Sequence, residues 1–189
     1  MTNLKEKTDK LQEWAKKQYE IAGAIRGHKS VNHHLALVMT EVAEAIEADR
    51  RDKRSEDAEF KKAIAQNAAG SEDSYFNACY RDYIKGTVEE EFADIALRIL
   101  DLAWLCFGEK MQWYNSQHLY IPYYCRLFTE KAQYLVKRIL DAGYFGLSDS
   151  LKFMYLWAEE MGIDLDFHIE QKLRFNAIDA QHPANNKKY

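Results

Sequence analysis

Two short acidic patterns carry most of the chemistry that this sequence offers. Glu41 and Glu44 are three residues apart in one strongly apolar segment, and Glu91 and Asp94 have the same spacing in another. Residues at this spacing share one face of an α-helix, so each pattern presents two carboxylates side by side. If the two helices pack together, four carboxylates meet in one cleft, and Mg²⁺ prefers such all-oxygen surroundings.

The simplest alternative is that these acids lie on the solvated faces of amphipathic helices, as single glutamates usually do. Against it, none of the four has a lysine four positions later, so they lack the usual partner for a surface pair along the helix. Arg98, four residues after Asp94, is the exception and can neutralise part of the cluster. Spacing alone leaves a metal site and a solvated acidic face both open.

Other kinds of metal site fit the sequence less well. Di-iron carboxylate bundles use Glu-x-x-His pairs, and none of the six histidines follows a glutamate by three residues. The adjacent His33 and His34 point in different directions on a helix, and such residues are more often surface or hydrogen-bonded histidines. An all-carboxylate site suits Mg²⁺-dependent phosphate chemistry. Because no Walker-type loop is present, hydrolysis of a phosphoanhydride is favoured over P-loop energy coupling.

The elements that must position these acids are predicted to be helices. Apolar residues recur at helical spacing, and the 189 residues include only 8 glycines and 2 prolines. Ser30 and Ser148 are expected N-caps, and Thr87 with Glu90 forms a capping-box pattern. The expected helices are 4–26, 31–51, 56–68, 72–85, 87–107, 124–142, 149–161 and 164–178.

These elements predict an all-α helical bundle that forms a single domain, 1–189. Within it, 49–86 is expected to be an inserted segment and 179–189 a loose tail. The helix over 87–107 is apolar on every side between residues 92 and 107, except for Asp94, Arg98 and Asp101. A helix of this kind is expected to be central and buried.

Composition disfavours several classes of protein. The formal charge of -4 offers no broad basic surface for nucleic acid, although Arg50, Arg51, Lys53 and Arg54 form a local cluster. The most apolar run is too short and too polar to span a bilayer, and no signal peptide is recognisable. Three cysteines without paired spacing fit a reducing compartment. A cytoplasmic protein that binds neither nucleic acid nor membrane is expected.

Three sequence blocks, in order, resemble the MazG-like nucleoside triphosphate pyrophosphohydrolases of the all-α NTP pyrophosphatase superfamily. The blocks are TEVAEAIEADRR (Thr40–Arg51), EEEFADIALRILDLA (Glu89–Ala103) and HIEQKLRFNA (His168–Ala177), with a terminal NNKKY. The resemblance implies an all-α bundle that binds Mg²⁺, with Mn²⁺ as a substitute. It also implies hydrolysis of an NTP or dNTP to the monophosphate and pyrophosphate, and assembly as a homodimer or homotetramer.

The same resemblance assigns roles to particular residues. Lys172 and Asn176 would contact the nucleotide, while Arg98 and Asp101 would support the metal ligands. The sequence departs from the family in the long 49–86 spacing and after Asn176. The metal ligands would be Glu41, Glu44, Glu91 and Asp94. They would also be the catalytic residues, because one of the glutamates would orient or deprotonate the attacking water.

Two interpretations compete with parts of this assignment. The aromatic segment 113–128 can offer a stacking platform for a base, with Trp113, Tyr114, Tyr120, Tyr123 and Tyr124 as candidates, but aromatics at this density more often pack in a core or an interface. The alternative for the whole protein is a non-enzymatic all-α interaction or regulatory protein. In that case the acidic stripe is a binding face.

Overall fold

The computed structural model describes residues 4–26, 30–66, 72–110, 120–142 and 146–181. Within these ranges the chain is all-α, as predicted, and contains helices without strands. The elements are α1 (Leu4–Arg26), α2 (Val31–Arg50), α3 (Asp57–Gln66), α4 (Glu72–Tyr83), α5 (Val88–Phe107), the short 3₁₀ helix η1 (Gly108–Lys110), α6 (Phe128–Ala142), α7 (Leu147–Glu160) and α8 (Leu165–Ala180).

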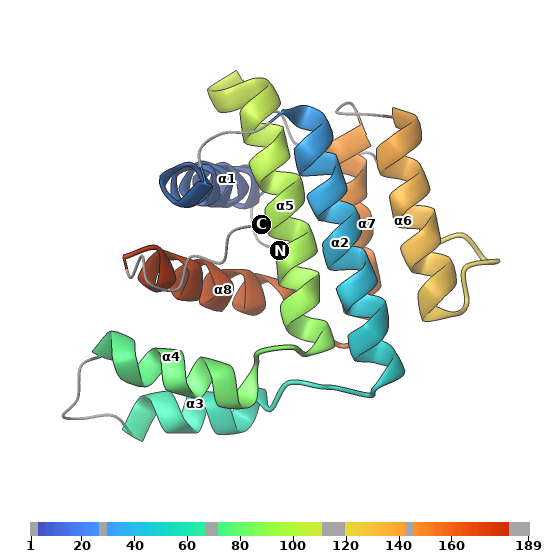
Figure 1. The fold of residues 1–189 in the computed structure, drawn as a ribbon. Coiled ribbons are helices and arrows are strands. Elements are labelled where there is room, and N and C mark those ends of the chain that lie inside the picture. Colours follow the sequence, from blue (N-terminus) through green and yellow to red (C-terminus); the bar gives the residue numbers. More distant parts are fainter. Residues whose placement is uncertain (1–3, 27–29, 67–71, 111–119, 143–145, 182–189) are drawn as a thin grey trace.

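Helix α5 is the centre of the fold, and it packs against α1, α2, α7 and α8. In Figure 1, α2, α5, α6 and α7 run side by side, whereas α8 and the α3–α4 hairpin lie across them. The apolar residues of α5 are buried from Phe92 to Ala103, whereas those from Trp104 to Phe107 are only partly buried. Helices of the same chain therefore cover α5 over 92–103, and the expected homodimer or homotetramer stays a prediction.

Within the segment 49–86, helices α3 and α4 pack against each other as a hairpin, and they share a small core with α8. Phe60, Phe76 and Tyr80 of the hairpin pack there against Phe175 of α8. The Tyr80 and Phe175 rings stack with centroids 4.5 Å apart and an interplanar angle of 20°. The hairpin is thus attached to the bundle mainly through α8, the helix that carries Lys172.

Two predicted N-caps are confirmed at the helices that carry the acidic pairs. Ser30 accepts a hydrogen bond from the His33 amide, and Thr87 accepts one from the Glu90 amide. Such bonds satisfy donors that the first helical turn leaves free. They fix where α2 and α5 begin.

Two predicted helix starts are wrong. Helix α6 begins at Phe128 instead of 124, because Cys125 N bonds Pro122 O in a turn and the Glu130 carboxylate accepts from the amides of Arg126 and Leu127. Helix α7 begins at Leu147 with Gly146 as its N-cap and no side-chain cap bond. Ser148 therefore lies inside the helix. Helix α8 also continues to Ala180, so any loose tail begins later than residue 179.

Candidate metal centre

Three of the four predicted acids meet between α2 and α5. One carboxylate oxygen each from Glu41, Glu91 and Asp94 lies within 4.8 Å of the other two. Glu41 and Glu91 are both 7% exposed, so this is a buried cluster rather than a solvated face. We refer to Glu41, Glu91 and Asp94 as the acidic centre.

Glu44 does not join this group, although the sequence pattern paired it with Glu41. The spacing does not cause this difference, because Glu91 and Asp94 have the same spacing and both join the group; the packing of α2 against α5 does. Glu41 points into the bundle, whereas Glu44 is exposed. Glu44 nevertheless lines a recess together with Glu91, which places it at the solvent side of the acidic centre.

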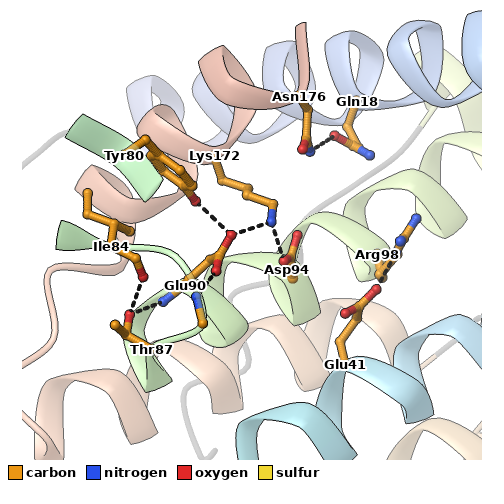
Figure 2. A network of polar contacts seen from close by, with 11 residues as sticks. Gln18, Glu41, Tyr80, Ile84, Thr87, Glu90, Asp94, Arg98, Lys172 and Asn176 are labelled. Carbon is orange, nitrogen blue, oxygen red and sulfur yellow. Dashed lines mark hydrogen bonds and ion pairs between the residues drawn. The ribbon is translucent and has the colours of Figure 1, made fainter. Parts of the chain in front are cut away.

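Two internal cations hold the acidic centre together (Figure 2). Arg98 Nε donates to Glu41 Oε1 at 2.8 Å, and Lys172 Nζ lies 2.5 Å from Asp94 Oδ2. Burial works to lower the pKa of Lys172, but the negative charges of Asp94 and Glu90 outweigh it and raise the pKa above its usual value. The ammonium therefore stays charged, and α8 is tied to α5 by a buried ion pair.

Glu90 is a site residue that the sequence analysis treated only as a helix cap. Its side chain is almost fully buried, and it accepts hydrogen bonds from Gly86 N, from Tyr80 Oη at 3.2 Å and from Lys172 Nζ at 2.7 Å (Figure 2). Glu90 thus joins the α3–α4 hairpin to Lys172. The run of three glutamates at 89–91 was the available signal, but acids in a first helical turn are expected for the helix dipole alone.

The electrostatics of the acidic centre favour a bound cation. Burial, followed by the charges of Asp94 and Glu90, raises the pKa of Glu91 from 4.5 to about 9. Burial also raises the pKa of Asp94, to about 6, even though Lys172 works to lower it. Within the described residues, Glu91 Oε2 is buried without a hydrogen-bond partner. An added positive charge would keep both acids ionised and would satisfy that oxygen.

Asp101, three residues after Arg98 on α5, faces His34 of α2. His34 Nδ1 and Asp101 Oδ2 are 3.2 Å apart, and both side chains are buried. Burial lowers the pKa of His34 in spite of the neighbouring carboxylate. The two adjacent histidines therefore differ. His34 is buried and contacts a carboxylate, whereas His33 is exposed. Asp101 thus joins α2 to α5 behind the acidic centre.

Asn176 lies one turn after Lys172 on α8, and its amide Nδ2 is 3.4 Å from Gln18 Oε1 of α1. Gln18 is buried, although the sequence analysis did not single it out. Figure 2 shows the two side chains facing each other. Helices α1 and α8 are therefore linked by an amide pair one turn along α8 from Lys172.

The aromatic segment does not reach this region where it is described. Tyr123 and Tyr124 are 85% and 58% exposed, and Tyr124 contacts the Tyr134 ring of α6. In Figure 1 the loop before α6 extends away from α2 and α5. Trp113 and Tyr114 lie outside the described residues, so their stacking role stays a prediction.

Comparison of the chain with protein-family models, with curated proteins and with solved structures gives no match. The resemblance of the three sequence blocks therefore stays a prediction. None of the described helices combines the length and the low polarity that crossing a bilayer requires.

Proposed function

We propose that this protein is a Mg²⁺-dependent nucleoside triphosphate pyrophosphohydrolase, which converts an NTP or dNTP to the monophosphate and pyrophosphate. One observation carries the proposal: Glu41, Glu91 and Asp94 bring three carboxylates within 4.8 Å in a buried position. Such a cluster is costly to maintain unless cations compensate it. The same residues carry the resemblance to the MazG-like enzymes.

The donor set fits a hard divalent cation. All three residues offer oxygen, and Mg²⁺ is commonly held by a few carboxylates, with water and substrate phosphate filling its other positions. Arg98 and Lys172 occupy one oxygen each of Glu41 and Asp94, and a carboxylate has a second oxygen to offer. Glu91 adds the buried oxygen without a partner. Bound Mg²⁺ would polarise phosphate oxygens and make hydroxide available near neutral pH.

The remaining chemistry is assigned to side chains of this chain. Water attacks a phosphorus atom of the triphosphate, the bond to the bridging oxygen breaks, and pyrophosphate leaves with the electron pair. Glu44 is exposed beside Glu91, so it is the glutamate placed to accept the proton of the attacking water. Lys172 keeps its charge and can turn from Asp94 to a phosphate oxygen. Asn176 and Gln18 offer amide groups to the sugar or the base.

The alternative, a non-enzymatic protein whose acidic stripe is a binding face, is less favoured. Glu41 and Glu91 are each 7% exposed, and Arg98 and Lys172 already contact the acidic centre from inside the bundle. A surface for a protein partner needs side chains that the partner can reach. Of the acids in the two patterns, only Glu44 is exposed.

The test is pyrophosphate release, measured over a panel of ribo- and deoxyribonucleoside triphosphates with Mg²⁺, with Mn²⁺ and with a chelator. Metal-dependent release that Asp94→Asn abolishes supports the proposal. Melting temperature with and without Mg²⁺ or Mn²⁺ provides a second readout, since a ligand that binds only the folded state must raise it. No release from any triphosphate and no metal-dependent shift would instead favour the interaction protein.

A further inference from the structure

A recess of about 190 Å³ opens beside the acidic centre, between the end of α2 and the start of α5. We call it the outer recess. It shares Glu91 with the acidic centre, and Glu91 is the side chain with the buried oxygen that lacks a partner within the described residues. Its lining contains Glu44, Glu47, Ala48, Arg51, Lys53, Gly86 and Glu91.

The two basic residues of this lining come from the local cluster that the sequence showed at 50–54. Arg51 pairs with Glu47 at 2.5 Å on the rim of the recess. Lys53 has no ion pair of its own among the residues that the structure describes, and its ammonium lies near Gly86. Arg50 and Arg54 pair with Glu47 and Asp49 and do not line the recess.

The backbone that carries Lys53 is fixed on both sides. Lys53 N donates to Ala48 O at 3.0 Å, and Lys53 O accepts from Val88 N at 3.1 Å. The preceding residue, Asp52, has a φ of 50°, a left-handed conformation that turns the chain back after α2. The Ser55 amide then donates to the Glu89 carboxylate at 2.9 Å. The segment after α2 is thus attached to the first turn of α5, and Lys53 is held at the recess.

The charge of the outer recess sets the kind of ligand that it can accept. Its lining offers the three carboxyl groups of Glu44, Glu47 and Glu91 against the two cations of Arg51 and Lys53. Glu44 and Glu47 alone already balance the two cations, so a free anion meets no net positive charge there. An anion that arrives with a divalent cation is different, since the metal offsets the acids and the free ammonium of Lys53 can bind the anion.

We propose that the outer recess binds the terminal phosphate groups of the substrate, the part that leaves as pyrophosphate, with Lys53 as the main phosphate contact and Arg51 as the second. This inference rests on the proposed function, because it takes the metal of the acidic centre as the bridge. The triphosphate then runs from Lys172 and Asp94 past Glu91 towards Lys53. Specificity for a polyphosphate over a monophosphate follows from this placement.

The experiment measures binding of inorganic pyrophosphate by calorimetry, with and without Mg²⁺, to the wild type and to three variants. Lys53→Gln should weaken pyrophosphate binding in Mg²⁺ by about tenfold to a hundredfold, as the loss of a charge-assisted contact does. Arg51→Gln should weaken it less, because Arg51 is shared with Glu47. Lys62→Gln, at an exposed lysine of α3 that pairs with Glu59 and does not line the recess, is the matched control and should leave it unchanged. Without Mg²⁺, binding should be lost in all four proteins.

Three results overturn the inference: pyrophosphate that binds without Mg²⁺, no binding in Mg²⁺, or Lys53→Gln and Lys62→Gln with equal affinities. Both substitutions are at exposed side chains, so circular dichroism should show unchanged folds. Failure of the inference is distinct from failure of the proposed function. If the wild type and Lys53→Gln both release pyrophosphate with the same KM, the proposed function stands and phosphate binding in the outer recess is refuted. If pyrophosphate binding depends on Lys53 but no triphosphate is hydrolysed, the proposed function is refuted and phosphate binding in the outer recess stands.

Discussion

Replacing Glu91 by glutamine should stabilise the protein in the absence of metal. Glu91 is buried beside Asp94 and Glu90, and its pKa is raised from 4.5 to about 9. Near neutral pH the folded state therefore holds a proton that the unfolded state has released. Such a group makes the free energy of unfolding fall as pH rises from about 4.5 to about 9. Glutamine has the same shape, stays neutral, and can donate to the neighbouring carboxylates.

The magnitude follows from the pKa shift. Each pH unit above the ordinary pKa costs the folded state about 1.4 kcal/mol, so at pH 7 the cost of Glu91 reaches about 3 kcal/mol. For a chain of this length, about 1 kcal/mol corresponds to roughly 2–4 °C in Tm. With chelator present at pH 7, Glu91→Gln should thus melt about 6–12 °C above the wild type. At about pH 5 the two proteins should melt close together, because the wild-type side chain is then protonated with little cost.

Bound metal should reverse which of the two proteins, wild type or Glu91→Gln, melts at the higher temperature. Added Mg²⁺ or Mn²⁺ should raise the melting temperature of the wild type, whereas the shift in Glu91→Gln should be small because one charged ligand is lost. The assay is thermal unfolding followed by circular dichroism over pH 5 to 8, with chelator and with each metal. Glu13→Gln, at an exposed position of α1, is the matched control and should behave as the wild type in every condition.

The reasoning is refuted if metal-free Glu91→Gln melts below the wild type by the same amount at every pH. That result would mean that Glu91 is ionised and already compensated by groups of the protein, as Glu41 is by Arg98. An unchanged metal response in Glu91→Gln would separately remove Glu91 from the ligands.

The remaining predictions concern the ion pairs around the acidic centre and the α3–α4 hairpin. Asp94→Asn should abolish pyrophosphate release. Its circular dichroism should stay nearly unchanged, because Lys172 keeps Glu90 as its partner. Unfolding of the variant instead of inactivity would contradict a catalytic role for Asp94. Glu90→Gln should lower the free energy of unfolding in urea by about 2–3 kcal/mol, since a buried ammonium loses one of its two carboxylates; a change below about 0.5 kcal/mol, the range of ordinary surface substitutions, would show that the network is not needed. Although burial opposes it, hydrogen bonds from His168 and Ser55 lower the pKa of Asp57, so its contribution to stability is present above the ordinary pKa and is lost as pH falls through the lowered one. Asp57→Asn should therefore cost at most about 1 kcal/mol at pH 7 and nothing in strong acid, as urea unfolding at both pH values can check.

Local signals in the sequence were enough to predict the helices and the two acidic pairs. The N-caps at Ser30 and Thr87 depend on a side chain and an amide three residues apart, so they can be read within one turn. The apolar periodicity of 92–107 likewise predicted a central buried helix, which α5 is. Local signals failed at α6 and α7, where a turn after Pro122 and the Glu130 carboxylate decide one start and Gly146 decides the other.

The composition of the acidic centre was decided by tertiary structure. Spacing made Glu41 and Glu44 equivalent, but the packing of α2 on α5 buries the first and leaves the second exposed. Arg98 was expected to compensate Asp94 on its own helix, yet it bonds Glu41 across the interface. Lys172 reaches Asp94 and Glu90 from 78 and 82 positions away. The physical reason is that a single helix fixes only which residues share a face, whereas the faces that meet, and the charges that must be paired once buried, depend on how distant helices pack.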